Sequence, residues 1–251
     1  MLKKLVSATA LFFAVSLSGH TKELVVWSAG ATKPPMEELV PEFQKLTGLT
    51  LKVEYAPVGV WTRRLADGGQ PDVLILSADV VNEVERKGWA VAGSAKPLGS
   101  VGVGVAVKQG AALPDVSTPE ALRATLLRAK SITYMDPQKG TSGKHFASVL
   151  EQLGISEQVK SKTTLGDVGY VLEPVARGDI ELGVQQITEI LPVQGATLVG
   201  PLPASLQKIT TYVVLIGAKA NDAKAALEFS QFLQAPQAAA VFKRKGFLVG
   251  N

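Results

Sequence analysis

The feature that most constrains the fold is a regular alternation of apolar, strand-like runs with segments of helical periodicity. The run PDVLILSAD at 71–79 is almost continuously apolar, as expected for a strand in a sheet covered on both faces. The segment PPMEELVPEFQKLTG at 34–48 has apolar residues at helical spacing, two prolines that suit a first turn and a glycine that suits an end. Repeated strand–helix units predict an α/β fold, with mostly parallel sheets and helices on both faces.

The order of these units predicts two lobes. Two strand–helix series of about equal length are followed by two C-terminal helices. We predict that 19–100 and 207–251 form lobe I and that 101–206 form lobe II. Ligands in such sheets bind where strands end and loops lead into helix N-termini, which offer backbone N–H groups and a favourable dipole to anions. The expected loops are SAGATKPP, APVGVW, DPQKGTSGKHF and TLGDVGYV.

The N-terminal residues predict export. Residues 1–18 have a basic start, an apolar run shorter than the roughly 20 residues that span a bilayer, and small residues at the end. This order predicts a signal peptide cut after Ser18; the alternatives are a membrane anchor or a buried helix. The chain has no cysteine, which leaves no disulfide, no thiolate nucleophile and no site for a lipid anchor. We therefore expect a periplasmic protein that is not lipid-anchored.

The charge balance does not indicate nucleic acid as a partner. The formal net charge is +4, but two of the 26 Lys and Arg residues, Lys3 and Lys4, lie in the predicted leader. The rest of the chain has 24 basic residues against 22 acidic ones. A weak positive balance of this kind is compatible with a small anionic ligand.

No catalytic or metal-binding motif stands out. The chain has two histidines, His20 and His145, which are far apart in the sequence, so a histidine-rich metal site is not expected. The Gly-Lys pair at 143–144 does not complete a phosphate-binding P-loop, because Gln138 replaces the first glycine and His145 replaces the serine or threonine. The sequence therefore predicts no cofactor and no metal.

Five segments, in order, carry a resemblance to a known family. They are VVWSAGATKPPMEEL, PDVLILSAD, DPQKGTSG, DVGYVLEPVARGDIELGV and FLQAPQAAAVFKRKGF. Over about residues 23 to 249 the chain resembles the periplasmic molybdate-binding proteins of ABC transporters, as a divergent member. The resemblance implies the type II periplasmic-binding-protein fold, with one small ligand in a cleft between two lobes. It also implies capture of this ligand and its delivery to an inner-membrane ABC permease. We expect the protein to be a monomer.

The binding positions that the resemblance implies depart from the family pattern. Ala31 and about Gly59 hold the places of two ligand-binding serines, and Gln186 holds the place of a tyrosine. Backbone N–H groups at Ser142 and Val168 would be kept. The full set expected to bind the ligand is Ser28, Gly30, Ala31, Thr32, Gly59, Val60, Ser77, Thr141, Ser142, Gly143, Val168 and Gln186. Each lost charge-assisted hydrogen bond is worth roughly 1.5–3 kcal/mol, which argues against simple transfer of molybdate specificity.

Two classes of function follow. Because a glutamine both donates and accepts, Gln186 suits an organic acid better than an oxyanion. The main prediction is a non-enzymatic solute-binding protein for a molybdate-like oxyanion or a small organic acid. The alternative is a periplasmic enzyme, or a signalling receptor, that acts on a small carboxylic acid with the same fold. Candidate acids and bases for the enzyme are Lys139, Lys144, His145 and Glu189; the sequence leaves open which of Arg63, Arg64, Lys139 and His145 reach the cleft.

Overall fold

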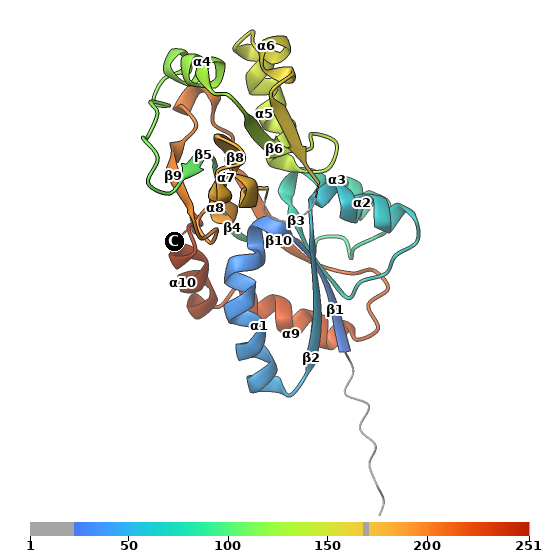
Figure 1. Ribbon diagram of the computed structural model, residues 1–251. Coiled ribbons are helices and arrows are strands. Elements are labelled where there is room, and N and C mark those ends of the chain that lie inside the picture. The colour runs from blue at the N-terminus through green and yellow to red at the C-terminus, as the bar shows by residue number, and fades with distance from the viewer. Residues whose placement is uncertain (1–22, 168–170, 251) are drawn as a thin grey trace, which may run out of the picture.

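The computed structural model describes residues 23–167 and 171–250, which form two lobes, one above the other in Figure 1. The predicted signal peptide, 1–18, and Val168 lie outside the described residues. Each lobe is built on a five-stranded sheet. Within the described residues, no helix is long and apolar enough to cross a membrane.

The lower sheet has the strand order β2-β1-β3-β10-β4. Its strands are β1 (Glu23–Ala29), β2 (Thr50–Ala56), β3 (Val73–Ser77), β4 (Lys96–Val101) and β10 (Thr210–Ile216). The helices around it are α1 (Lys33–Thr47), α2 (Val58–Ala66), α3 (Val81–Arg86), α9 (Ala223–Leu233) and α10 (Pro236–Arg244), with short 3-10 turns η1 (Gly30–Thr32) and η2 (Ala78–Val80). Every residue of β3 is buried, as its continuous apolar run predicts.

The upper sheet has the order β7-β6-β8-β5-β9. Its strands are β5 (Val103–Lys108), β6 (Ile132–Met135), β7 (Thr163–Gly166), β8 (Leu182–Gln186) and β9 (Ala196–Pro201). The helices are α4 (Pro119–Arg128), α5 (Thr141–Gln152), α6 (Ser156–Lys160), α7 (Glu173–Arg177) and α8 (Ile187–Ile190), with the 3-10 turn η3 (Ala204–Leu206). In both sheets one strand, β10 or β5, runs against its two neighbours. The other four strands of each sheet therefore point one way.

Each reversed strand follows a crossing between the sheets. The chain leaves the lower sheet at the end of β4 and enters the upper one at β5, through Gly102 alone. It returns between β9 and β10. This arrangement brings the ends of strands from both sheets, and the helices that follow them, to the junction of the lobes.

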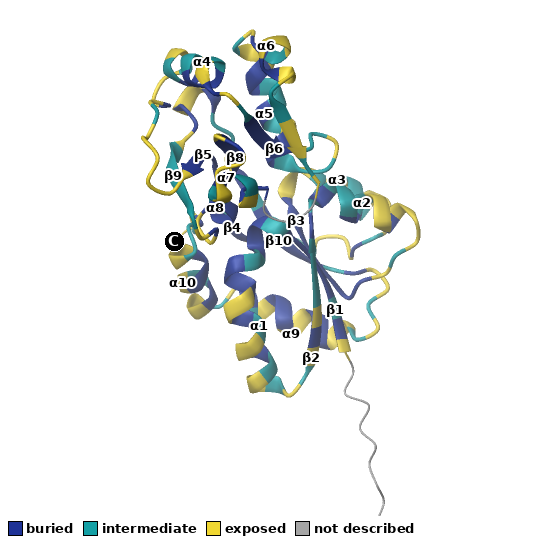
Figure 2. Cartoon of the chain, in the orientation of Figure 1, coloured by how far each residue is buried: buried dark blue, intermediate teal, exposed yellow. Residues whose placement is uncertain are grey.

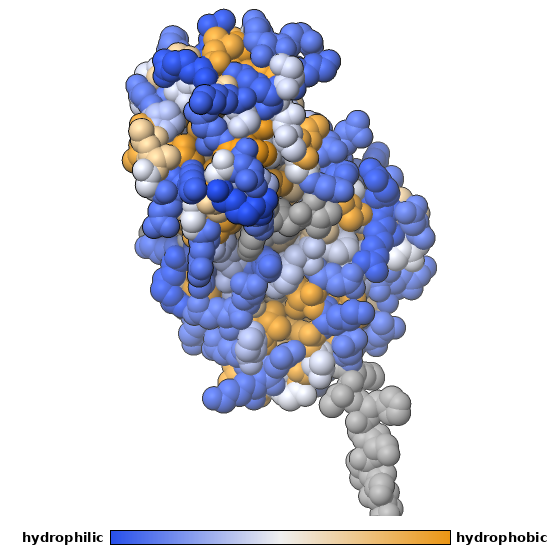
Figure 3. Space-filling model, viewed as in Figure 1, coloured by the Kyte–Doolittle hydropathy of each residue, from blue (hydrophilic) through white to orange (hydrophobic). Residues whose placement is uncertain are grey.

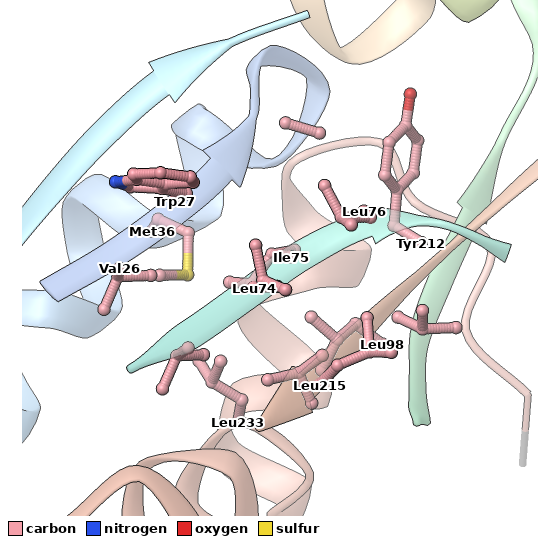
Figure 4. Close-up of a cluster of buried hydrophobic side chains, with 14 of the residues drawn as sticks. Val26, Trp27, Met36, Leu74, Ile75, Leu76, Leu98, Tyr212, Leu215 and Leu233 are labelled. Atoms are coloured by element: carbon pink, nitrogen blue, oxygen red, sulfur yellow. The ribbon is translucent and has the colours of Figure 1, made fainter. Parts of the chain in front are cut away.

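Each lobe is stabilised by an apolar core of its own. In the lower lobe, Met36 and Phe43 of α1 pack with the buried strand residues Leu74 and Ile75 and with Phe229 of α9. Figure 4 shows part of this cluster, and Figure 2 shows that the strands are mostly buried while the outer helix surfaces are exposed. The face shown in Figure 3 is mostly hydrophilic, with apolar residues in several small groups.

The lobes contact each other directly. The Gly59 N–H donates a hydrogen bond of 2.9 Å to the Lys139 carbonyl oxygen in the opposite lobe. A Cβ atom on Gly59 would lie 2.7 Å from that oxygen, so this close approach requires a glycine. A further ion pair of 2.6 Å joins Lys208, on the returning segment, to Asp79 of η2. The loop predicted at APVGVW is in fact the start of α2, which places Gly59 in a helical first turn.

Candidate active site

A cavity of about 210 Å³ lies between the lobes. Lobe I, the lower lobe in Figure 1, contributes the turn after β1, the end of β2, the start of α2 and one side chain of β10. Lobe II contributes the end of β6, the start of α5 and side chains from α7 and α8. Since a cavity needs only about 10–15 Å³ of such volume to hold one water molecule, this cavity has room for a small organic molecule.

Four of the positions predicted from the sequence line this cavity: Gly30, Ala31, Thr141 and Ser142. The last two lie in the first turn of α5, where backbone N–H groups have no partner inside the helix. The N-terminus of a helix of this length favours an anion. The strand-to-helix loop DPQKGTSGKHF therefore does reach the cavity, through its final turn.

The other predicted positions that the structure describes do not line the cavity. Ser28 and Thr32 are fully buried and bind each other, with 2.6 Å between their hydroxyl oxygens, and Thr32 also donates to the Ala29 carbonyl oxygen. The Gly59 N–H is used by Lys139 in the opposite lobe. The remaining predicted positions that the structure describes are not on the cavity wall either: Val60, Ser77, Gly143 and Gln186.

The charged residues that the sequence left open point elsewhere. Arg63 and Arg64 are exposed; Arg64 pairs with Glu54 at 2.6 Å, and its guanidinium lies 4.4 Å from the Trp27 ring centre. Lys139 pairs with Asp136 and Asp167. His145 Nε2 lies 2.7 Å from the Leu206 carbonyl oxygen, which makes this nitrogen the donor. None of these side chains lines the cavity, and neither does that of the exposed Lys144.

Glu189 is the buried carboxyl group of the site. It lies in α8, is 8% exposed and lines the cavity. Burial raises the pKa of this carboxyl to about 8, and a hydrogen bond with the Gln185 side chain acts in the opposite direction. At neutral pH the group is therefore mostly protonated. Such a carboxyl can both give and take a proton near physiological pH.

Tyr212 brings a hydroxyl to the same cavity. It lies on β10, and Figure 4 shows its hydroxyl pointing away from the apolar cluster. Gln186 Nε2 donates to the Tyr212 hydroxyl and to the Thr141 hydroxyl, at 3.4 Å each. Because an amide N–H only donates, both hydroxyl oxygens act as acceptors there. The two hydroxyl oxygens also lie 3.4 Å apart, so one hydroxyl donates to the other unless a ligand accepts its hydrogen instead. Burial raises the pKa of the Tyr212 hydroxyl above its ordinary value, which keeps it a neutral donor.

Four polar or charged residues of the lining were not among the sequence candidates: Lys33, Tyr55, Glu173 and Tyr212. Lys33 and Tyr55 stand in or beside loops that were expected to reach the ligand, so their position in those loops was the available signal. Tyr212 lies on a strand that enters from the far end of the chain, and no local pattern marks it. Within the described part of the chain, no cluster of three or more His, Cys, Asp or Glu side chains could hold a metal ion.

Comparison with known proteins now identifies the family. The family model described as bacterial extracellular solute-binding protein matches residues 24–248. The chain belongs to this family. The predicted resemblance to molybdate-binding proteins is confirmed by the molybdate-binding protein ModA of Escherichia coli, which is 26% identical over 98% of this chain and 97% of its own length. The periplasmic molybdate-binding protein of Azotobacter vinelandii confirms the predicted fold, with a TM-score of 0.77, 19% identity and coverage of 91% of this chain and 100% of that one.

Another relative of this family member is named as an enzyme. The aconitate isomerase of a Pseudomonas species is 31% identical over 229 residues, which cover 89% of this chain and 86% of that protein. The relatives of this solute-binding protein thus include both binding proteins and an isomerase. The expectation that this chain is not an enzyme agrees with the relatives named as binding proteins, and the relative named as an isomerase argues against it.

Proposed function

We propose that this protein is a periplasmic isomerase of a small unsaturated polycarboxylic acid such as aconitate. The observation that carries this proposal is the buried Glu189 carboxyl in the interlobe cavity, beside hydroxyl and backbone donors. The ionised form of this carboxyl repels any anionic ligand, so ligand binding alone does not explain its place on the cavity wall. A proton-transfer enzyme needs a group of this kind.

The reaction needs only a proton transfer. Aconitate is propene-1,2,3-tricarboxylate, in which a methylene carbon is joined to the double bond. Glu189 in its ionised form removes one methylene proton, the double bond moves by one carbon, and the protonated Glu189 returns the proton to the former vinyl carbon. One C–H bond breaks and one forms, so no oxidant, reductant or cofactor is consumed. Because the carbon skeleton is symmetrical, the product is the same compound with either cis or trans geometry.

The donors in the cavity stabilise the negative charge that develops during this transfer. Removal of the methylene proton spreads charge from the carbon skeleton onto a substrate carboxylate. The Thr141 and Tyr212 hydroxyls and the first-turn N–H groups of α5 are neutral donors that face this space. Donors that are fixed in place before the reaction stabilise such charge effectively.

Gln185 determines which oxygen of Glu189 carries the proton. The Gln185 amide oxygen accepts a hydrogen bond of 3.2 Å from the Val171 N–H, which fixes the orientation of the amide. The amide NH₂ therefore faces Glu189, its other hydrogen-bond partner. Since an NH₂ only donates, the Glu189 oxygen in that contact is unprotonated. The proton must sit on the other oxygen.

The second candidate function is capture of an organic acid for an ABC importer. Family membership and the relatives named as molybdate-binding proteins favour it. In this version the same cavity binds the acid reversibly, and the partner is an inner-membrane permease. Both versions place the protein in the periplasm after cleavage of the predicted signal peptide, without a lipid anchor.

One experiment separates these functions. Residues 19–251 are incubated with cis-aconitate, and separately with trans-aconitate, in D₂O, and proton NMR follows both isomers. Interconversion with deuterium incorporation supports the isomerase. A thermal shift with an acid but no conversion supports the importer, because a ligand at a hundred times Kd stabilises by about 2.7 kcal/mol. A shift with molybdate or tungstate alone would contradict both versions.

A further inference from the structure

We propose that Lys33 selects polycarboxylic acids, by binding a carboxylate of the substrate that is remote from the reacting carbon. This inference deepens the proposed function and rests on it for the class of substrate. Lys33 is the only cationic side chain on the cavity wall among residues 23–167 and 171–250. The acidic side chains of the same wall are Glu173 and Glu189.

The charge of a tricarboxylate requires a cation in the site. The hydroxyls of Thr141 and Tyr212 and the start of α5 offer neutral donors, which suffice for one carboxylate. Further carboxylates bring additional negative charge into a half-enclosed space, beside Glu173. Without a positive group their desolvation is not compensated. Lys33 supplies the formal positive charge of this wall.

The position of Lys33 is well defined. It is the first residue of α1, directly after the turn that carries Gly30 and Ala31 to the cavity. The next two residues, Pro34 and Pro35, are buried in lobe I, so the backbone at this point is held by packing. The ammonium group lies 6.0 Å from the centre of the Tyr55 ring, and Tyr55 also lines the cavity.

The contact of Lys33 with Glu37 does not account for its position on the cavity wall. The two groups are 3.7 Å apart, and their side chains are 36% and 59% exposed. An exposed pair one helical turn apart contributes little to stability. A substrate carboxylate enclosed in the cavity would be screened less than Glu37 and would bind the ammonium group more strongly.

Binding measurements on matched variants test this inference. Lys33→Met, Lys33→Arg and Lys45→Met are titrated calorimetrically with tricarballylate, the saturated tricarboxylate, and with crotonate, an unsaturated monocarboxylate. Lys45 is an exposed lysine in the last turn of the same helix, away from the cavity, and is the control. Circular dichroism and thermal unfolding establish that each variant is folded.

Lys33→Met is expected to lose roughly ten- to a hundredfold in affinity for tricarballylate, the size of one charge-assisted contact. Its crotonate affinity should change less than threefold, Lys33→Arg should stay within a few-fold of wild type, and Lys45→Met should match wild type. Equal losses for both acids, or unchanged tricarballylate binding, would overturn the inference. Lys33-dependent binding of tricarballylate without conversion of aconitate would refute only the isomerase. Conversion of aconitate by the wild type, together with an unchanged preference of Lys33→Met for tricarballylate over crotonate, would refute only the role of Lys33. A wild-type protein that binds neither acid would refute both.

Discussion

The Glu189 carboxyl lies directly against Gly30, with Oε1 only 2.6 Å from the point where a Cβ atom on Gly30 would be. The contact joins the two lobes, since Gly30 follows β1 and Glu189 follows β8. A methyl group at this position must displace the carboxyl, because no real Cβ contact is so short. The absence of a side chain at residue 30 thus sets the place of the buried acid.

Gly30→Ala should therefore lower kcat/KM for aconitate at least tenfold, since misplacement of a catalytic group by about 1 Å can cost a hundredfold. The overpacking should also destabilise the fold by about 1–3 kcal/mol, which urea unfolding would measure. Gly200→Ala is the matched control, because its Cβ would meet only Val116 at an ordinary 3.9 Å. Full activity in Gly30→Ala would show that the position of Glu189 is not critical.

Glu189→Gln should remove proton transfer while keeping the shape of the site. The amide cannot act as an acid or base, so kcat should fall by about a hundredfold or more. Binding of tricarballylate should be kept or become tighter, because the variant can no longer place a negative charge in the cavity. The measurements are the rate of deuterium incorporation into aconitate and calorimetric binding. An isomerisation rate close to that of wild type would exclude Glu189 as the proton carrier.

The same carboxyl should make stability depend on pH. Its folded-state pKa is raised from 4.5 to about 8, so the folded protein binds more protons than the unfolded chain between these values. The free energy of unfolding should consequently fall as pH rises from about 5 to 8, by an amount on the order of a few kcal/mol. Urea unfolding of wild type and Glu189→Gln at several pH values isolates the effect, since other titrating groups are common to both. Parallel curves for the two proteins would contradict it.

Tyr212→Phe should remove a donor from the cavity without opening a hole. We expect about a tenfold loss in kcat/KM for aconitate, because one neutral hydrogen bond to the developing charge is lost. Stability should change by about 1 kcal/mol or less. The control is Tyr134→Phe, at a buried tyrosine of lobe II that does not line the cavity. If both variants lose activity equally, the effect is structural and the role given to the Tyr212 hydroxyl is wrong.

Local sequence pattern was sufficient to predict the two-lobed fold and one end of the cavity. Each of these signals lies within a short stretch of sequence. They are the apolar run of β3 and the two strand-to-helix loops, one at Gly30 and one at Thr141. The opposite wall depends on distant parts of the chain. Tyr212 meets Thr141, 71 residues away, only because β10 returns from the other lobe. The family pattern placed a tyrosine hydroxyl at Gln186, whereas here Gln186 is buried next to a tyrosine supplied by β10.

Gln185 allows a test of the Glu189 pKa that does not depend on the shape of the cavity. Its hydrogen bond stabilises the ionised form of Glu189 and so lowers the pKa of that carboxyl. Gln185→Leu removes the bond, and the pKa of Glu189 should rise further. A base with a higher pKa is ionised only at higher pH. The rising limb of the profile of kcat/KM against pH should therefore shift to higher pH, by about half a pH unit or more. Thr125→Val, at a buried polar side chain of α4 outside the cavity, is the control and should leave the limb in place. A lower rate in Gln185→Leu with no movement of the limb would mean that Gln185 only supports packing and does not tune Glu189.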